Sequence, residues 1–205
     1  RCRDLEKPPG LPRRDPRDVA FVVNDSSLMP GGDGSTPSCV VLIGPPGSGK
    51  TTVGRALANL LGVPFRDTDH AIEAQEGRSI SDIFMDDGEP RFRELEQAEV
   101  ASSLATHVGV LSLGGGAVMD PATKAAIVGH TVVFLDVGIA DAAKRVGFDR
   151  SRPLLAVNPR GQWMQMMEVR RPTYEALATF TVQTAGLTPQ DIAAEIVQRL
   201  GTNDE

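Results

Sequence analysis

The sequence predicts an α/β fold: a three-layer α/β/α arrangement around a five-stranded parallel sheet. From residue 39 onward, short apolar runs alternate with amphipathic helical patterns. The run TVVFLD at 131–136 is apolar on both faces, as in parallel strands that helices cover on each side. The run at 39–43 leads directly into GPPGSGKT at 44–51 and then into a helical pattern, which is the context of a phosphate-binding loop.

The apolar and helical patterns place each element in turn. We expect strands at 39–43, 64–67, 109–113, 131–136 and 179–183. We expect helices at 50–61, 68–76, 79–86, 89–106, 121–128, 139–146, 160–178 and 189–200. Right-handed crossovers would make the five strands parallel, so residues that follow them should gather at one edge, where ligands of such sheets bind.

Residues 1–38 differ from the rest of the chain. They hold six Pro, four Gly and equal numbers of basic and acidic residues, six of each, with little periodicity. This composition predicts a disordered extension before a domain at 39–205, with Met29 as a candidate translation start. A partner-binding or regulatory tail is the functional alternative.

Composition also limits the partners. A net charge of −6 and a pI near 5.1 argue against a general nucleic-acid-binding surface. No apolar run approaches the length that crosses a membrane. The two cysteines, Cys2 and Cys39, do not suggest a disulfide framework, which fits a reducing cytoplasm. We expect a cytoplasmic monomer.

The loop at 44–51 carries the complete G-x-x-x-x-G-K-[ST] pattern and predicts binding of ATP with Mg²⁺. Its glycines let backbone N–H groups converge on phosphate oxygens at the start of a helix. Lys50 would reach the β- and γ-phosphates, and the Thr51 hydroxyl would ligate Mg²⁺. The alternative is a glycine-rich turn that binds nothing.

Two carboxylates, Asp67 and Asp69, follow the second expected strand. Asp67 could hold Mg²⁺ through water, and Asp69 could accept a proton from a substrate hydroxyl. Alternatively, Asp67 or Thr68 is the N-cap of the following helix and Asp69 favours its dipole.

Arg93 and a glycine run supply further candidates. Arg93, near the start of a long helix, could hold a carboxylate with its planar guanidinium. It could instead form exposed pairs with Glu89 or Glu96. Gly114, Gly115 and Gly116 follow the third strand, where they form either a close backbone approach to a ligand or a flexible turn.

Arginines cluster in two later segments of this acidic protein. Arg145, Arg150 and Arg152 lie in or near a polar loop, which is typical of a lid that closes over phosphates at about 147–158, or simply of a solvated loop. Arg170 and Arg171 lie in a helical pattern and could simply form a solvated helix face. Pro172, in the same pattern, could kink or restart the helix. The only tryptophan, Trp163, and nearby methionines are expected to pack. The scattered histidines do not predict a zinc site.

In this order, the segments resemble shikimate kinase over most of residues 39–200. The resemblance rests on D-T-D at 67–69, F-R at 92–93, G-G-G-A at 114–117, R-P-L-L at 152–155 and R-x-P-x-Y at 170–174. It implies a P-loop kinase fold with a mobile lid, and ATP-dependent phosphorylation of the 3-hydroxyl of shikimate in the chorismate pathway towards aromatic amino acids.

The resemblance also implies site roles. The expected catalytic residues are Asp69, the candidate base, with Lys50 and Arg152. The expected ATP contacts are Gly47, Ser48, Gly49, Lys50, Thr51, Thr52, Arg145 and Arg152. The expected shikimate contacts are Asp69, Arg93, Gly114, Gly115, Gly116 and Arg170, and the expected metal-binding residues are Thr51 and Asp67. Pro172 and Tyr174 favour Arg170 over Arg171 in the motif.

Two alternatives differ in function. A gluconate or nucleoside kinase shares the loop, but a nucleoside acceptor calls for stacking aromatics, and aromatics make up only 4% of the chain. A regulatory nucleotide-binding protein would be marked by loss of Lys50, Asp69 or Arg152, and all three are present.

Overall fold

The computed structural model describes residues 39–146 and 158–201. The extension expected at 1–38 and the expected lid, apart from Asn158, lie outside these residues. Arg150 and Arg152 are among the residues not described.

A five-stranded parallel sheet forms the centre of the molecule, as predicted. The strands are β1 (Cys39–Ile43), β2 (Phe65–Asp67), β3 (Gly109–Ser112), β4 (Thr131–Asp136) and β5 (Phe180–Gln183), in the order β2-β3-β1-β4-β5. Every pairing is parallel, for example Val41 with Leu111 on one side of β1 and with Val132 on the other. β1 is therefore the central strand, and the phosphate-binding loop leaves the middle of the sheet.

The helices agree with the sequence patterns to within two residues. They are α1 (Lys50–Leu61), α2 (Thr68–Glu76), α3 (Ile80–Asp86), α4 (Gly88–Thr106), α5 (Pro121–Ala126), α6 (Ile139–Val146), α7 (Pro159–Leu177) and α8 (Pro189–Gly201). A short 3₁₀ helix, η2 (Ala117–Met119), was not predicted. Pro172 lies inside α7, which continues through it to Leu177, so of the two expectations, a kink or a restart, the restart was wrong.

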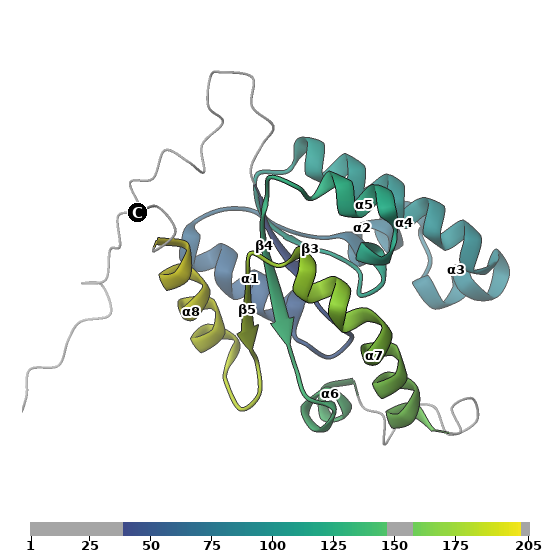
Figure 1. Ribbon diagram of the computed structural model, residues 1–205. Helices are drawn as coiled ribbons and strands as arrows, with labels where there is room; N and C mark the ends of the chain where they lie inside the picture. Colours follow the sequence, from purple (N-terminus) through teal and green to yellow (C-terminus); the bar gives the residue numbers. More distant parts are fainter. Residues whose placement is uncertain (1–38, 147–157, 202–205) are drawn as a thin grey trace, which may run out of the picture.

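Helices cover both faces of the sheet, which makes three layers (Figure 1). Alternate residues of β1 enter different cores because strand side chains alternate between faces. Val41 and Ile43 pack with residues of α4 and α7, whereas Val40 and Leu42 pack with residues of α1 and α8. In Figure 1, α1 and α8 lie on one side of the sheet and α4, α5 and α7 on the other. All five residues of β1 are buried, as expected for a central parallel strand.

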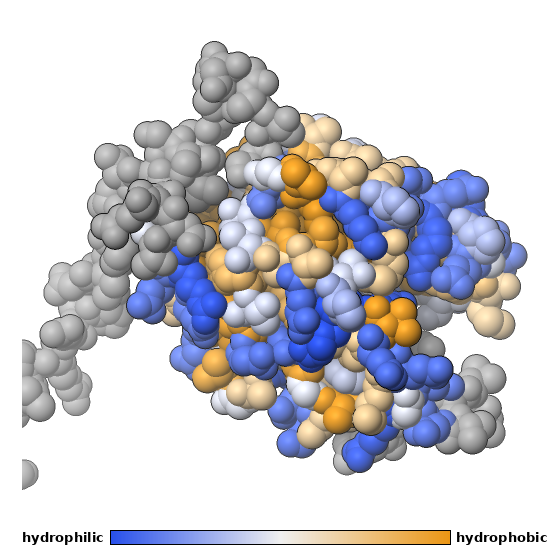
Figure 2. Space-filling view, in the orientation of Figure 1, coloured by the Kyte–Doolittle hydropathy of each residue, from blue (hydrophilic) through white to orange (hydrophobic). Residues whose placement is uncertain are grey.

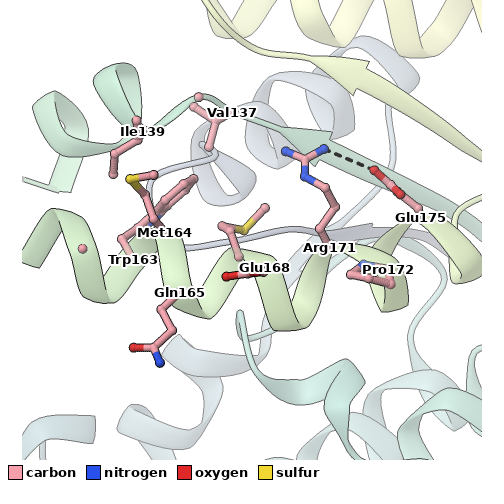
Figure 3. Close-up of a pocket in the computed structure, with 12 residues that line it drawn as sticks. Val137, Ile139, Trp163, Met164, Gln165, Glu168, Arg171, Pro172 and Glu175 are labelled. Atoms are coloured by element: carbon pink, nitrogen blue, oxygen red, sulfur yellow. Dashed lines mark hydrogen bonds and ion pairs between the residues drawn. The ribbon is translucent and has the colours of Figure 1, made fainter.

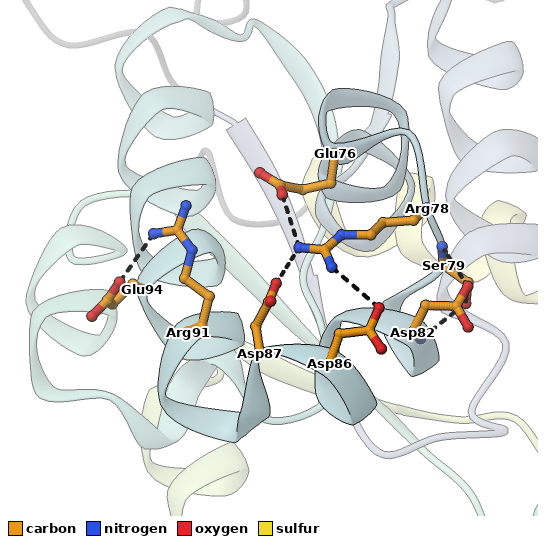
Figure 4. Close-up of polar contacts among 8 residues, drawn as sticks. All are labelled: Glu76, Arg78, Ser79, Asp82, Asp86, Asp87, Arg91 and Glu94. Atoms are coloured by element: carbon orange, nitrogen blue, oxygen red, sulfur yellow. Dashed lines mark hydrogen bonds and ion pairs between the residues drawn. The ribbon is translucent and has the colours of Figure 1, made fainter.

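The helices α2, α3 and α4 form a separate corner with its own small core of Ile72, Ile83 and Phe92. Arg78, between α2 and α3, pairs with Glu76 at 3.5 Å, with Asp86 at 3.5 Å and with Asp87 (Figure 4). These ion pairs connect the end of α2 to the end of α3. They help to fix the start of α4, the helix that carries Arg93.

The surface of the described residues is mixed in polarity. Figure 2 shows hydrophilic residues over much of α7 and α8, with hydrophobic residues in smaller groups between them. Exposed large apolar side chains are spread over several elements, at Leu60, Phe84, Met85, Val128, Met164, Val169 and Leu187. Among the helices of the described ranges, none is both long and apolar enough to cross a membrane.

Candidate active site

The loop between β1 and α1 has the backbone that a phosphate-binding loop requires. Gly44, Gly47 and Gly49 have φ values of 145°, 84° and 91°, which L side chains rarely adopt. A Cβ on Gly44 would lie 2.6 Å from the carbonyl oxygen of Leu135, so the loop also needs glycine there for close packing. Gly49 is the N-cap of α1 and supplies no side-chain hydrogen bond, which leaves the first N–H groups of the helix for a ligand.

Lys50 and Ser48 are held ready within this loop. The ammonium of Lys50 donates to the carbonyl oxygens of Gly44 at 2.9 Å and Pro45 at 3.2 Å. Burial lowers the pKa of Lys50, while the nearby carboxylates of Asp69 and Asp67 oppose that shift. The Ser48 hydroxyl is buried and has no hydrogen-bond partner among the residues that the structure describes. A buried polar atom without a partner is costly, which is consistent with a site shaped for a polar ligand.

Thr51 and Asp67 meet at the carboxyl edge of the sheet. The Thr51 hydroxyl donates to Oδ2 of Asp67 at 2.8 Å. Oδ1 of the same carboxylate accepts the backbone N–H groups of Asp69 at 3.1 Å and His70 at 3.4 Å. Asp67 is therefore the N-cap of α2, which was the alternative considered from the sequence, and it also reaches the residue expected to bind the metal. One carboxylate does both.

Asp69 lies in the first turn of α2, beside the loop. Burial, and after it the Asp67 carboxylate, raises the pKa of Asp69 to about 6, with Lys50 acting in the opposite direction. Oδ1 of Asp69 is buried and has no hydrogen-bond partner within residues 39–146 and 158–201. This carboxylate is consequently available to a substrate hydroxyl, and it is ionised above about pH 6.

Arg93 points from α4 towards the glycine run. It donates to Oε2 of Glu96 at 2.6 Å and to Oε1 of Glu89 at 3.0 Å, so both surface pairs considered from the sequence exist. Glu96, however, is only 3% exposed. A Cβ on Gly116 would lie 2.7 Å from the Arg93 guanidinium. Arg93 is thus held against the glycine run by a buried carboxylate, and its pair with Glu96 differs from a solvated pair on a helix surface.

The absence of a side chain at Gly114 makes room for two acids. A Cβ at this position would lie 2.6 Å from Oδ1 of Asp69 and 2.6 Å from Oε1 of Glu96. The Gly114 N–H donates to the buried hydroxyl of Thr68 at 3.0 Å, which fixes the run beside α2. The glycine run therefore approaches two acidic side chains of the protein closely, and its expected approach to a ligand stays a prediction.

Arg170 reaches the same run from α7. Its guanidinium donates to the carbonyl oxygen of Gly115 at 3.2 Å, and the Tyr174 hydroxyl donates to that oxygen at 2.5 Å. Arg171, its neighbour, turns instead to Asp136 at 2.7 Å and 2.9 Å. Arg170, the residue that the motif favoured, is the one that lies with Asp69 and Arg93 around the glycines.

Arg145 lies on the other side of the loop. It donates to the carbonyl oxygens of Gly47 and Ser48, both at 3.3 Å, and to the hydroxyl and carbonyl of Thr184 at 3.0 Å and 2.7 Å. The Thr52 hydroxyl donates to the Gly49 carbonyl at 2.9 Å, within the first turn of α1. Arg145 therefore joins the loop to the segment after β5, away from the acids.

Two contributors were not identified from the sequence as site residues. Glu96 was considered only as a surface partner of Arg93, but it is buried in the structure, where it lies beside Gly114 of the glycine run. Trp163, expected to pack, is buried and also donates its indole N–H to the Pro46 carbonyl at 3.1 Å. The pairing of residues so far apart in sequence leaves no local signal.

A nucleotide-type loop, an acid at its edge and two arginines around a glycine run define a P-loop kinase of small molecules. The family model described as shikimate kinase matches residues 46–201. The chain belongs to the shikimate kinase family. All of the expected site residues except Arg152 lie in the described part of the chain, along the carboxyl edge of the sheet.

Individual relatives agree with the family model. The chain is 60% identical over 164 residues to the shikimate kinase of Salinispora tropica, covering 80% of this chain and 98% of that protein. It is 52% identical over 166 residues to the shikimate kinase of Thermobifida fusca, covering 81% and 96%. Its structure is similar to that of an Acinetobacter baumannii shikimate kinase in complex with shikimate, with a TM-score of 0.77 and 34% identity, covering 82% and 94%.

Proposed function

We propose that this protein transfers the γ-phosphoryl group of ATP to the 3-hydroxyl of shikimate, giving shikimate 3-phosphate and ADP. Membership of the family and similarity to a shikimate-bound structure support this function. The observation that carries it is the grouping of a carboxylate, Asp69, and two cations, Arg93 and Arg170, around the glycine run. A small acid with several hydroxyls needs both kinds of group.

The acceptor is bound by the two arginines. Arg93 and Arg170 hold the shikimate carboxylate, because guanidinium groups match carboxylate geometry and stay charged. The backbone of Gly114, Gly115 and Gly116 lies beside the acceptor ring. A Cβ at these positions would meet Asp69 at 2.6 Å, Pro46 at 3.2 Å and Arg93 at 2.7 Å, so side chains there would displace the groups that bind the acceptor. Binding by these groups turns the acceptor hydroxyl towards the loop and orients it for attack.

Asp69 binds the acceptor hydroxyls and accepts the proton of the attacking hydroxyl. Its Oδ1 lacks a hydrogen-bond partner in the described part of the chain, and its pKa of about 6 leaves it ionised at neutral pH while keeping it a stronger base than an exposed aspartate. Lys50 binds the β- and γ-phosphates and stabilises their negative charge during transfer.

The nucleotide is held by the loop at Gly47, Ser48, Gly49, Lys50, Thr51 and Thr52, with Arg145 near the adenine. Thr51 and Asp67 fit Mg²⁺, because both present oxygen donors and Mg²⁺ is commonly held by one or two protein groups together with phosphates. Within the residues that the structure describes, no group of three or more acidic, His or Cys side chains forms a separate metal cage. When bound, Mg²⁺ neutralises phosphate charge.

Arg152 keeps the role that the sequence suggests, neutralising charge on the transferring phosphoryl group. Arg152→Ala is expected to reduce kcat about 10³-fold, with smaller effects on the KM for either substrate, since its charge matters most in the transition state. Unchanged turnover in this variant would remove Arg152 from the mechanism.

A substrate panel tests the proposal as a whole. ADP release is measured in a coupled assay with shikimate, quinate, gluconate and nucleosides as acceptors, and with Mg²⁺ omitted in a parallel series. We expect ADP release that depends on shikimate and on Mg²⁺. Intact ATP binding without shikimate-dependent turnover would overturn the assignment.

A further inference from the structure

Two adjacent arginines on α7 point to different parts of the molecule. Successive residues of an α-helix are rotated by about 100°, so Arg170 and Arg171 leave α7 in different directions. Arg170 reaches the Gly115 carbonyl at 3.2 Å. Arg171 makes a paired contact with Asp136, through Nη2 to Oδ1 at 2.7 Å and Nη1 to Oδ2 at 2.9 Å. The direction of one arginine is therefore linked to the anchorage of the other.

Asp136 is a firm anchor because it ends the strand β4. Its side chain is 10% exposed, and its carboxylate also accepts the amide N–H of Gln183, the last residue of β5, at 2.9 Å. Burial by itself would raise the pKa of Asp136, but the hydrogen bonds from Arg171 and Gln183 lower it overall. The fork of Arg171 thus grips a charged carboxylate that belongs to the rigid sheet.

The turn of α7 that carries Arg170 depends on such side-chain contacts. Pro172 lacks an N–H group, so the helix loses one backbone hydrogen bond at this turn. The Tyr174 ring stacks on the ring of Phe134 in β4, with centroids 5.1 Å apart. The Arg171 guanidinium lies 5.8 Å from the centroid of the Phe134 ring. These contacts hold the turn of α7 that carries Arg170 against β4.

We propose that Arg171 is a positioning residue for the acceptor: its fork on Asp136 fixes the rotation of α7 and so aims Arg170 at the acceptor's carboxylate. The inference rests on the proposed function, since it concerns how the same site binds shikimate. Arg171 acts through Arg170 and touches no substrate itself.

Space around Arg171 makes the idea testable by substitution. The residue lines a pocket of about 810 Å³ between α6 and α7, together with Trp163, Glu168 and Glu175 (Figure 3). Figure 3 also shows the contact from Arg171 to Glu175, at 3.2 Å, on the exposed side of the helix. A lysine or methionine at 171 fits without crowding the core.

Three single variants separate the fork from the rest of the residue. Arg171→Met removes it, Arg171→Lys keeps the charge without the paired geometry, and Glu175→Gln removes only the exposed partner. We expect the KM for shikimate to rise about tenfold in Arg171→Met and about threefold in Arg171→Lys, because a small misplacement of a clamp is costly. The KM for ATP is expected to stay within about twofold, and Glu175→Gln to match the parent protein.

A double-mutant cycle with Arg170→Met distinguishes positioning from general destabilisation. If Arg171 acts through Arg170, Arg171→Met adds little to the KM for shikimate once Arg170 is already methionine. An equal effect in both backgrounds, or an equal rise in the KM for ATP, would overturn the inference. Absence of shikimate turnover in the parent protein would instead contradict the proposed function, and direct titration of shikimate binding gives a readout independent of turnover.

Discussion

Arg93 and Glu96 form a 2.6 Å ion pair on α4 in which the acid is buried and the arginine is not. The Glu96 side chain is 4% exposed and that of Arg93 38%. Such a pair differs from ordinary helix-surface pairs, because removing the arginine leaves a buried carboxylate without its partner. The acid fixes the direction of the guanidinium and keeps it beside Gly116.

Arg93→Ala is expected to weaken shikimate binding strongly and to leave nucleotide binding nearly intact. Loss of a charged hydrogen-bonding partner costs about 2–3 kcal/mol, or roughly a 30- to 150-fold increase in the dissociation constant. Titration of shikimate and of ADP into the same variant measures both effects.

The neighbouring Arg91 gives a matched control for this variant. It pairs with exposed Glu94 at 3.0 Å on the same helix, away from the glycine run. Arg91→Ala should leave both affinities within about twofold, as expected for an exposed pair. An equal loss of shikimate and nucleotide binding in Arg93→Ala would reject its role as a clamp.

Proton acceptance by Asp69 predicts a pH dependence. With a pKa of about 6, the carboxyl is protonated and inactive as a base at lower pH, so kcat/KM should rise with pH and level off above about pH 7. Asp69→Asn should lower kcat by roughly 10²- to 10⁴-fold and abolish the inflection near pH 6. A parent profile that is flat from pH 5 to 8 would argue against Asp69 as the base.

The same carboxyl should cost stability at neutral pH. Its pKa in the folded protein lies above the ordinary 3.8, so the folded state binds the proton more tightly, and stability falls as pH rises from about 4 to about 6. Without ligands at pH 8, Asp69→Asn should therefore unfold at a higher urea concentration than the parent, with a free energy of unfolding higher by roughly 1–3 kcal/mol. This gain in stability should be smaller at pH 5.

Asp191 provides the opposite sign as a control. Hydrogen bonds from Thr188 lower its pKa, so its charged form favours the folded state. Asp191→Asn should be less stable than the parent at pH 8. A stability loss of the same sign in Asp69→Asn at pH 8 would contradict the assignment of a costly buried charge to Asp69.

Gly114→Ala tests the space between the two acids. The new Cβ would lie 2.6 Å from Asp69 and from Glu96, so both carboxylates must move and the shikimate KM should rise at least about tenfold. Gly138→Ala is the matched control, because no atom of the described residues would lie within 4 Å of its Cβ. Circular dichroism spectra establish folding in both variants, and equal kinetics in the two would disprove the crowding argument.

Trp163 offers a signal for the loop, since it is the only tryptophan of the chain and donates to Pro46. Binding of ADP should change its fluorescence, because the loop that accepts its N–H also binds the phosphates. Lys50→Met, which removes the phosphate-binding ammonium, should suppress the change. Fluorescence that responds to shikimate alone but not to ADP would contradict this link.

The sequence predicted the sheet and the loop well because both have local causes. Apolar runs such as 39–43 and 131–136 form strands wherever helices cover them, and the loop needs glycine at positions where φ is positive. Motif residues after different strands, such as Asp69 and Gly115, meet because parallel strands end at one edge.

What could not be predicted depends on packing between distant segments. Glu96 has the spacing of a surface pair, and only the approach of the glycine run buries it. The motif favoured Arg170 over Arg171, but the contact of Arg171 with Asp136 depends on the rotation of α7 over β4 and had no signal in the sequence. Arg152 and the expected lid stay predictions, as do the monomeric state and the cytoplasmic location.

The two oxygens of Asp67 make the start of a helix and the expected metal position a single mechanical unit. Oδ1 caps α2, and Oδ2 meets the Thr51 hydroxyl. Loss of activity after substitution of Asp67 is therefore ambiguous, since the variant loosens the helix that carries Asp69 as well as the metal position. For an engineer, a substitution at Thr51 would test the expected metal position without removing the cap of α2, whereas one at Asp67 would change both.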